Sequence, residues 1–207
     1  MSENGRLDRM LDRHEISTLL IRWGHARDGD HWDVLADCFH DDATIHISWI
    51  SDTAKEFVRR SEGMNSARKP GEHGKHYVGG PWIIVEGTRA FSRVHVNLVA
   101  RGTIDGVEFD TTNWFRFFDL LEKRDGVWRI YKRTAVYEKD RIDPVPPATF
   151  PEGFFDSVDL EAFPHQTRFM NFRQVKRGTE TRSDVVTVFS KEEAALRDEG
   201  EAWLAGK

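Results

Sequence analysis

Residues 75–139 read KHYVGGPWIIVEGTRAFSRVHVNLVARGTIDGVEFDTTNWFRFFDLLEKRDGVWRIYKRTAVYEK. Apolar and polar residues alternate through most of this stretch, which predicts β-strands that bury one face. Glycine-containing turn signals divide it into four long predicted strands, at about 75–86, 89–102, 107–122 and 127–139. Because the links between them are short, the strands are expected to form an antiparallel meander.

Helical patterns precede these strands. Residues 7–27 are expected to form an amphipathic helix, because apolar side chains recur at helical spacing at Ile16, Leu19, Leu20 and Trp23. We expect Gly29 to end this helix and Asp30 to cap a short second one.

The segment 43–49 alternates like a strand, and residues 53–68 have the pattern of a third helix. Helices followed by an antiparallel sheet indicate an α+β fold in which the helices pack on one face. Gly79-Gly80-Pro81 is expected to bend the first long strand.

The proline cluster Asp143-Pro-Val-Pro-Pro147 ends the strand-rich unit. We therefore predict one domain at 1–143 and a C-terminal extension at 144–207. The extension holds too few apolar residues for a core of its own, so it should pack on the same domain or on a neighbouring subunit. Its phenylalanines between Phe150 and Phe172 are candidates to cover a pocket, and Ser190-Lys-Glu-Glu193 is a capping box that should open a final helix.

The composition indicates a soluble globular protein. Of 207 residues, 39% are hydrophobic and 31% charged, and the net charge of −5 argues against a strongly basic nucleic-acid-binding protein. Cys38 is the only cysteine, so no intrachain disulfide can form. The sequence has no apolar run of about 18 residues and no secretory signal, so we expect a cytoplasmic protein that binds no membrane.

Asp28 and His76 are the residues that most suggest chemistry. Taken singly, each is more often an exposed surface residue. Taken together, a carboxylate that binds one imidazole nitrogen leaves the other nitrogen free to accept a proton, and it stabilises the imidazolium that results. Such a base in an apolar cavity fits proton abstraction followed by elimination or isomerisation.

Other constellations give weaker signals. His73 with His76, or the group at 40–46, can be drawn as metal ligands, but neither matches an established metal motif. No Gly-x-Gly-x-x-Gly motif or P-loop is present, so we expect neither a metal nor a cofactor. A basic run in the extension is best explained as a solvated face or as subunit salt bridges; it comprises Arg168, Arg173, Lys176, Arg177 and Arg182.

Three motifs, in order, resemble a known superfamily. Gly24-His-Ala-Arg-Asp28 and the segment 32–43 resemble the opening of the SnoaL-like branch of the NTF2-like superfamily. Lys75-His-Tyr-Val-Gly-Gly80 resembles the histidine segment of scytalone dehydratase, and Asp125-Gly-Val-Trp128 resembles the superfamily's last hairpin. The resemblance covers about residues 7–140. It implies a cone-shaped, curved antiparallel sheet with N-terminal helices enclosing a pocket, a cystatin-like α+β barrel, and an Asp–His base pair at Asp28 and His76.

The resemblance also has departures that bear on the substrate. Trp23 stands where the dehydrochlorinase of the family has a lysine, and Phe115 and Phe117 stand where scytalone dehydratase has polar residues. The pocket is therefore expected to be more apolar and aromatic. His95 and Asn97 lie on one face of their strand, and the periodicity does not decide which face lines the pocket. The substrate-binding candidates are Trp23, Tyr77, His95, Asn97, Phe115, Phe117, Tyr131 and Tyr137.

The leading hypothesis is a cofactor-independent lyase that acts on a small hydrophobic aromatic or polycyclic molecule. The expected reaction of this lyase is either dehydration or retro-aldol release of formaldehyde. An isomerase of the same fold, and a non-catalytic scaffold such as the small subunit of a ring-hydroxylating dioxygenase, remain alternatives. By analogy with the family we expect a homodimer or homotrimer that associates through the outer face of the sheet, with Trp114 and Phe118 as candidate contacts.

Overall fold

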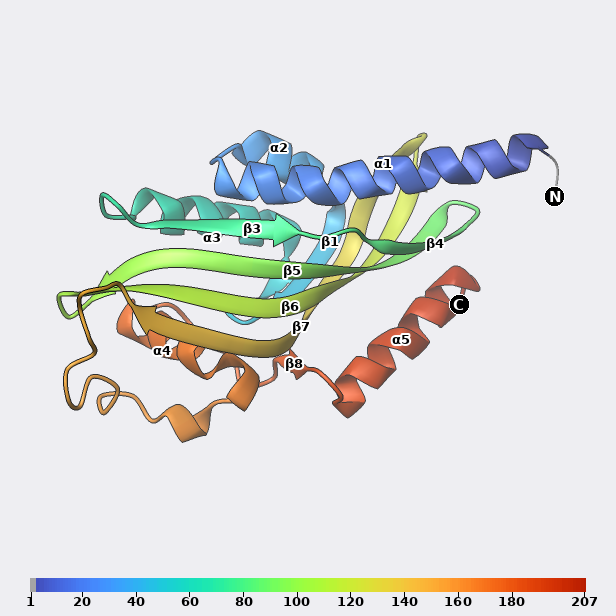
Figure 1. Cartoon of the computed structure of the whole chain (residues 1–207). Coiled ribbons are helices and arrows are strands. Elements are labelled where there is room, and N and C mark those ends of the chain that lie inside the picture. Colours follow the sequence, from blue (N-terminus) through green and yellow to red (C-terminus); the bar gives the residue numbers. More distant parts are fainter. Residues whose placement is uncertain (1–2) are drawn as a thin grey trace.

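The computed structural model describes residues 3–207 as an N-terminal helical layer, a long curved sheet and a C-terminal segment that returns across it (Figure 1). The α-helices are α1 (Glu3–Asp28), α2 (Trp32–Asp37), α3 (Ala54–Ser66), α4 (Arg168–Lys176) and α5 (Lys191–Leu204). The strands are β1 (Phe39–Ile47), β2 (Ile50–Thr53), β3 (His73–Val78), β4 (Trp82–Glu86), β5 (Arg89–Ile104), β6 (Val107–Arg124), β7 (Val127–Pro144) and β8 (Val186–Thr187). Two 3-10 turns lie at Leu160–Ala162 and His165–Thr167.

The first helix forms as predicted, and its apolar stripe from Ile16 to Trp23 is buried in the main core. Its connection to α2 differs from the expectation. Asp30, not Gly29, adopts the left-handed conformation, with a φ of 60°. Asp30 does not cap α2: the N-cap position is held by His31 without a side-chain hydrogen bond, and Asp30 Oδ1 accepts from Asn65 Nδ2 instead. Aspartate adopts the left-handed conformation more readily than most non-glycine residues, so Asp30 can occupy it where a glycine was expected.

The strands form one sheet in the order β2-β1-β7-β6-β5-β3, in which β4 pairs with β5 and β8 with β7. The pairings from β3 to β7 are antiparallel, as the short turns predicted, whereas β1 and β8 pair with β7 in parallel. The expected strand at 75–86 is divided at Gly79-Gly80-Pro81 into β3 and β4, because proline cannot donate a ladder hydrogen bond. The sheet is open and does not close into a barrel.

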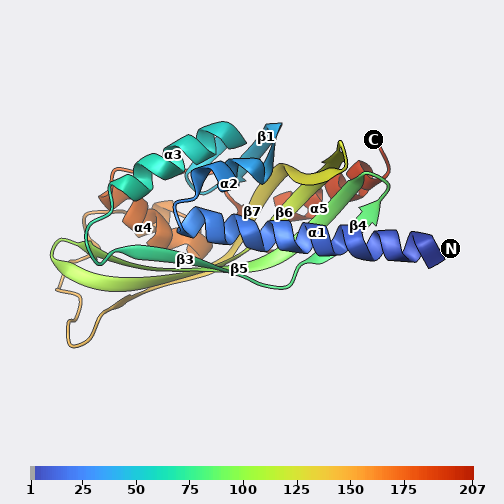
Figure 2. The ribbon, with the colours of Figure 1, turned by 90° about the horizontal axis from the view of Figure 1, so that it is seen from above.

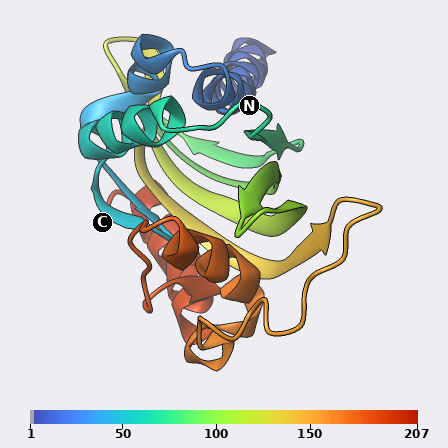
Figure 3. The ribbon, with the colours of Figure 1, turned by 90° about the vertical axis from the view of Figure 1, so that its left-hand side faces the viewer.

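The long strands curve around the space below α1 and α3 (Figure 3). Seen from above, α1 runs along the sheet while α2 and α3 lie beside it (Figure 2). The buried core between these layers holds residues of all three helices and the inner faces of β5, β6 and β7. Alternation along β6 assigns the two faces, since Phe115 and Phe117 belong to this inner core whereas Arg116 pairs with Glu138 and Glu193 on the other side.

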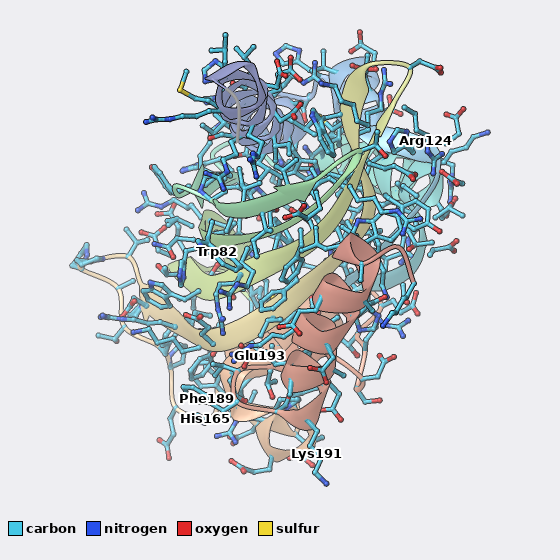
Figure 4. The ribbon with its side chains drawn as sticks, turned by 90° about the vertical axis from the view of Figure 1, so that its right-hand side faces the viewer. Trp82, Arg124, His165, Phe189, Lys191 and Glu193 are labelled. Carbon is cyan, nitrogen blue, oxygen red and sulfur yellow. The ribbon has the colours of Figure 1, made fainter. Side chains whose placement is uncertain are left out.

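The C-terminal segment covers both faces of the sheet. Residues of α4 line the inner side, and α5 packs on the outer side against Phe91 and Phe118. Figure 4 shows α5 in front of the strands, with Glu193 near its start. Ser190 caps the final helix as predicted, since its Oγ accepts from the backbone N–H of Glu193 at 3.1 Å, but Glu193 Oε2 accepts from the backbone N–H of Phe189 and not from that of Ser190. Glu193 in turn is buried and pairs with Arg116 at 3.0 Å, which fastens α5 to β6.

This arrangement changes one expectation about assembly. Phe118 is buried, 3% exposed, beneath α5 and is not free for subunit contacts. Trp114 is half-buried, with Lys139 Nζ at 4.6 Å from its ring centroid. Association as a homodimer or homotrimer remains a prediction.

Candidate active site

A cavity of about 920 Å³ lies between the helices and the inner face of the sheet. Its walls come from α1, α3, β3, the inner faces of β5, β6 and β7, and α4. A volume of this size accommodates a drug-sized molecule. Both Asp28 and His76 line it.

Asp28 and His76 are joined by two hydrogen bonds across the cavity wall. His76 Nδ1 lies 2.6 Å from Asp28 Oδ1, and the backbone N–H of His76 donates to Asp28 Oδ2 at 2.6 Å. The carboxylate at the end of α1 is therefore hydrogen-bonded to both the backbone and the side chain of His76 in β3. The ring of His76 also packs edge-on against Trp23, with centroids 5.3 Å apart. Within the described residues, His76 Nε2 has no hydrogen-bond partner, so it is free to act on a bound molecule.

The environment favours a neutral imidazole beside an ionised carboxylate. Desolvation by burial lowers the pKa of His76 below its usual value; Asp28 opposes this shift, and the positive charges of Arg27 and Arg133 reinforce it. For Asp28, burial opposes ionisation, but hydrogen bonds from His76 and the nearby Lys75 outweigh it, so its pKa lies below the usual value. At neutral pH the proton on Nδ1 then points to Asp28 and the lone pair of Nε2 is available as a base.

Gly24 brings α1 close enough to β3 for this contact. A Cβ at residue 24 would lie 2.9 Å from Val78 Cγ2 and 3.6 Å from the carbonyl oxygen of His76. Only a residue without a side chain permits this approach, one helical turn before Asp28. The glycine thus positions the carboxylate on the strand.

Aromatic rings form the wall next to His76. Trp23, Phe115 and Phe117 line the cavity, and Phe117 packs edge-on against Trp23 with centroids 5.1 Å apart. Behind them lies Arg133, which is 1% exposed and pairs with Asp119 at 2.7 Å. Its guanidinium stacks on Phe117, 4.0 Å from the ring centroid. The cavity is therefore apolar at this end and has a buried cation behind its aromatic layer.

Tyr137 presents a hydroxyl proton at the same site. Its ring is buried, and its oxygen accepts a hydrogen bond from the backbone N–H of Ser48 at 2.9 Å. Burial raises the pKa of Tyr137 to about 12, despite the opposing hydrogen bond from Ser48, so this hydroxyl stays protonated as a donor.

Trp23, Phe115, Phe117 and Tyr137 thus lie in the cavity wall, where the sequence analysis expected substrate-binding residues. That they touch substrate remains a prediction.

Four other candidates do not line the cavity. Tyr77 is 65% exposed because it alternates with His76 along β3, and it therefore points to the outer face. His95 and Asn97 are exposed on the same outer face of β5, opposite Val94 and Val96, which are buried in the core. The register thus settles the ambiguity that the periodicity left open.

Tyr131, the fourth of these candidates, does not share a face of β7 with Tyr137. The pairing of β6 with β7 shifts register between Leu120 and Leu121, which leaves Tyr131 as an extra, bulged residue. A bulge interrupts the period-two alternation of side chains. Tyr131 accordingly stacks on Trp203 of α5, with centroids 5.0 Å apart and an interplanar angle of 8°.

The polar part of the cavity wall was not predicted from the sequence. Arg27 is buried at 9% exposure and donates to Asn65 Oδ1 at 2.9 Å. From the C-terminal extension, Met170, Arg173 and Gln174 of α4 also line the cavity. The phenylalanines between Phe150 and Phe172 do not, since they cluster with Ile104 and Phe109. The basic run that includes Arg173 was the available signal, but only the folded chain brings it to the cavity.

The weaker constellations have ordinary partners. His40 Nε2 lies 2.9 Å from the carbonyl oxygen of Glu122, and His46 lies within 3.0 Å of Ser51 Oγ and the carbonyl oxygen of Asp184. No group of three or more His, Cys, Asp or Glu residues in the described chain is arranged to hold a metal ion. No helix among the described residues is long and apolar enough to span a membrane.

Comparisons with known proteins agree with the fold. A family model for the SnoaL-like domain matches residues 8–134. Pea pathogenicity protein 2 of Fusarium vanettenii is 30% identical over 175 residues, which cover 83% of this chain and 72% of that protein.

Two solved structures are similar in shape. A putative scytalone dehydratase from Novosphingobium aromaticivorans has a TM-score of 0.56 and 18% identity, covering 68% of this chain and 97% of its own. A hexachlorocyclohexane dehydrochlorinase has a TM-score of 0.57 and 19% identity, covering 72% of this chain and 99% of its own. At these identities the likeness establishes the shared fold and not a shared reaction.

Proposed function

Because the chain belongs to the SnoaL-like domain family of the NTF2-like superfamily, we propose that it is a cofactor-independent lyase acting on a small hydrophobic aromatic molecule. The observation that carries this proposal is the free Nε2 of His76, which faces a cavity with an aromatic wall while Nδ1 is held by Asp28. A scaffold protein has no need of a buried, oriented and uncharged base of this kind.

In the proposed reaction, His76 Nε2 takes a proton from the substrate. The electron pair of the broken C–H bond becomes a carbon–carbon double bond as the bond to the leaving hydroxyl breaks. The imidazolium, stabilised by Asp28, then returns its proton to that hydroxyl, so that water leaves and His76 is neutral again. The hydroxyl of Tyr137 is suited to donate to a substrate oxygen on which negative charge develops.

The same base supports a second reaction. If Nε2 takes the proton of a substrate hydroxymethyl group, its oxygen can form a carbonyl as the adjacent carbon–carbon bond breaks, which releases formaldehyde. The electron pair of that bond stays on the remaining carbon, which then takes the proton back from the imidazolium. An isomerase differs only in that the proton returns to another carbon of the same molecule.

The test is a substrate screen by mass spectrometry without added metal or cofactor. It compares the wild type with His76→Ala and Asp28→Asn on hydroxylated aromatic, diaryl propanediol and steroid-like compounds. Loss of the mass of water identifies a dehydratase, loss of the mass of formaldehyde identifies the carbon–carbon lyase, and an unchanged mass with a new retention time identifies an isomerase. Turnover that survives both substitutions would remove the dyad from the mechanism. Absence of turnover on the whole panel would favour the non-catalytic scaffold.

A further inference from the structure

The cavity that holds His76 is strongly cationic away from its aromatic wall. Nine arginine and lysine residues line it, against four aspartate and glutamate residues. The chain as a whole has a net charge of −5, so this excess of positive charge is local to the cavity. One of the four acids, Asp28, is already committed to His76.

Most of the cations at the rim are neutralised by their own partners. Arg59 pairs with Glu56 at 2.6 Å on the same helix, and Arg177 pairs with Glu72 at 2.7 Å. Arg60, Arg101 and Lys176 also have carboxylate partners. Within the described residues, this leaves Arg27, Arg68, Lys69 and Arg173 without an ion pair.

Arg173 is the one of these four that α4 carries over the inner face of the sheet. Its Nη1 donates to Thr111 Oγ1 at 3.2 Å, which is the only hydrogen bond its guanidinium makes within residues 3–207. A guanidinium has five N–H donors, so four of those of Arg173 have no acceptor among the described residues. Burial and the neighbouring Arg177 lower the pKa of Arg173 to about 10, although the charges of Glu72 and Asp140 oppose the shift, so it remains a cation at neutral pH.

Arg173 is half-buried, and its partial burial costs free energy because one neutral hydroxyl does not replace the lost hydration. An anion bound in the cavity would supply the missing acceptors. The planar fork of a guanidinium matches the two oxygens of a carboxylate, which makes a bidentate pair the best fit.

The strand register gives the backbone separation between His76 and Thr111, the residue to which Arg173 is hydrogen-bonded. His76 is opposite Leu98, which is opposite Asn113, and Thr111 lies two residues along β6 from Asn113. Two interstrand steps and two residues along a strand place the backbone of Thr111 about 12 Å from that of His76. A substrate that reaches from His76 to Arg173 has the length of a two-ring aromatic molecule, and we use that length for the probes below.

We propose that the substrate is an aromatic carboxylate, whose ring system lies against Trp23 and Phe117 and whose carboxylate is bound by Arg173. The proposal rests on the lyase function proposed above and defines its substrate class. Arg173 then fixes which end of the molecule is presented to His76, and a neutral analogue of the same shape should bind more weakly.

The experiment is calorimetric titration of the full chain with three probes of one shape: biphenyl-4-carboxylate, its carboxamide and biphenyl-4-yl phosphate. The wild type should bind the carboxylate about tenfold or more tightly than the carboxamide. Arg173→Gln should abolish this preference, and Arg173→Lys should restore part of it, because the charge remains without the planar fork. Arg59→Gln removes a rim cation that already has its own carboxylate partner, and it should leave the preference unchanged.

A carboxylate and a carboxamide that bind the wild type equally would overturn the proposal, as would a preference that survives Arg173→Gln in a variant with an unchanged thermal unfolding curve. Tighter binding of the aryl phosphate would reassign the site to phosphate and reject the carboxylate. His76→Ala separates the two proposals. In His76→Ala the preference for the carboxylate should persist, because His76 is not part of the anion site. If the wild type shows this preference but turns over no aryl carboxylate, the lyase proposal fails and the anion site stands. His76-dependent turnover of neutral aromatics without a carboxylate preference defeats the anion site alone.

Discussion

Asp28 binds both the side chain and the backbone of His76, with each carboxylate oxygen 2.6 Å from a nitrogen of the same residue. The backbone hydrogen bond fixes the carboxylate relative to β3, and the side-chain hydrogen bond then fixes the tautomer and the orientation of the ring. An imidazole held in this way needs no rearrangement before it accepts a proton at Nε2.

Asp28→Asn should lower kcat by about 10²- to 10⁴-fold, because an amide neither holds the Nδ1–H tautomer nor stabilises the imidazolium. The change conserves shape, so thermal unfolding should shift little compared with the loss of activity. The measurement is kcat on whichever substrate the mass-spectrometric screen identifies. An Asp28→Asn enzyme with near-wild-type kcat would show that the carboxylate only supports the fold.

The pH profile of kcat/KM should report the protonation of His76. Since burial lowers its pKa below the usual value of 6.5, the enzyme should keep its activity below pH 6.5 and lose it only when Nε2 becomes protonated. Asp28 raises the pKa of His76, so in Asp28→Asn the acidic limb should move to still lower pH. An acidic limb in the wild type well above pH 7 would contradict the neutral, desolvated imidazole.

Gly24→Ala should impair activity more than stability. The added Cβ would lie 2.9 Å from Val78 Cγ2 and would push the end of α1 away from β3, which lengthens the contact between Asp28 and His76. The double variant Gly24→Ala with Val78→Ala removes the clashing methyl groups and should recover part of the lost kcat. Gly80→Ala, at a glycine that does not line the cavity and has no atom within 4 Å of the added Cβ, is the control and should leave kcat unchanged. Failure of the second substitution to rescue would argue against close helix–strand approach as the cause.

The buried pair of Arg133 and Asp119 supports the aromatic wall from behind. Asp119→Ala should reduce the free energy of unfolding by about 3–5 kcal/mol, because it leaves the guanidinium buried without its carboxylate. Replacing both residues by apolar ones, as in Arg133→Met with Asp119→Leu, should cost far less. Urea unfolding of the single and double variants measures both values, and equal destabilisation by the two would refute this account.

Asp140 should make the stability of the α4 region depend on pH. It accepts a hydrogen bond from the backbone N–H of Met170 at 2.8 Å, and burial raises its pKa to about 6 despite that bond. Because the folded-state pKa exceeds the unfolded value, the stability linked to this group is fully present below about pH 4 and is lost as the pH rises through 6. Asp140→Asn keeps a side-chain acceptor without the charge, so it should raise Tm at pH 7.5 but not at pH 4. If the difference in Tm between Asp140→Asn and the wild type is the same at pH 4 and at pH 7.5, Asp140 is not the source of this pH dependence.

Local patterns were sufficient to predict most of the fold. The apolar spacing from Ile16 to Trp23 predicted α1, and the alternation after residue 89 predicted three long antiparallel strands, because both periods follow directly from backbone geometry. Asp28 and His76 could be named as a pair, since the motif around each resembles one in a known family. Their contact, however, joins residues 48 positions apart in sequence, and no local pattern measures such a distance.

The sequence by itself thus determined the order of helices and strands, the inner face of α1 and the two residues proposed as the base. Only the tertiary structure decided which face of β5 lines the cavity, that a bulge turns Tyr131 outward, and that α4 carries Arg173 over the sheet. The physical reason is that a period of two fixes alternation but not its sign, which is set by what packs against each face. The net charge of the cavity wall likewise depends on which arginines and lysines form ion pairs with carboxylates, and only the folded chain determines those pairs.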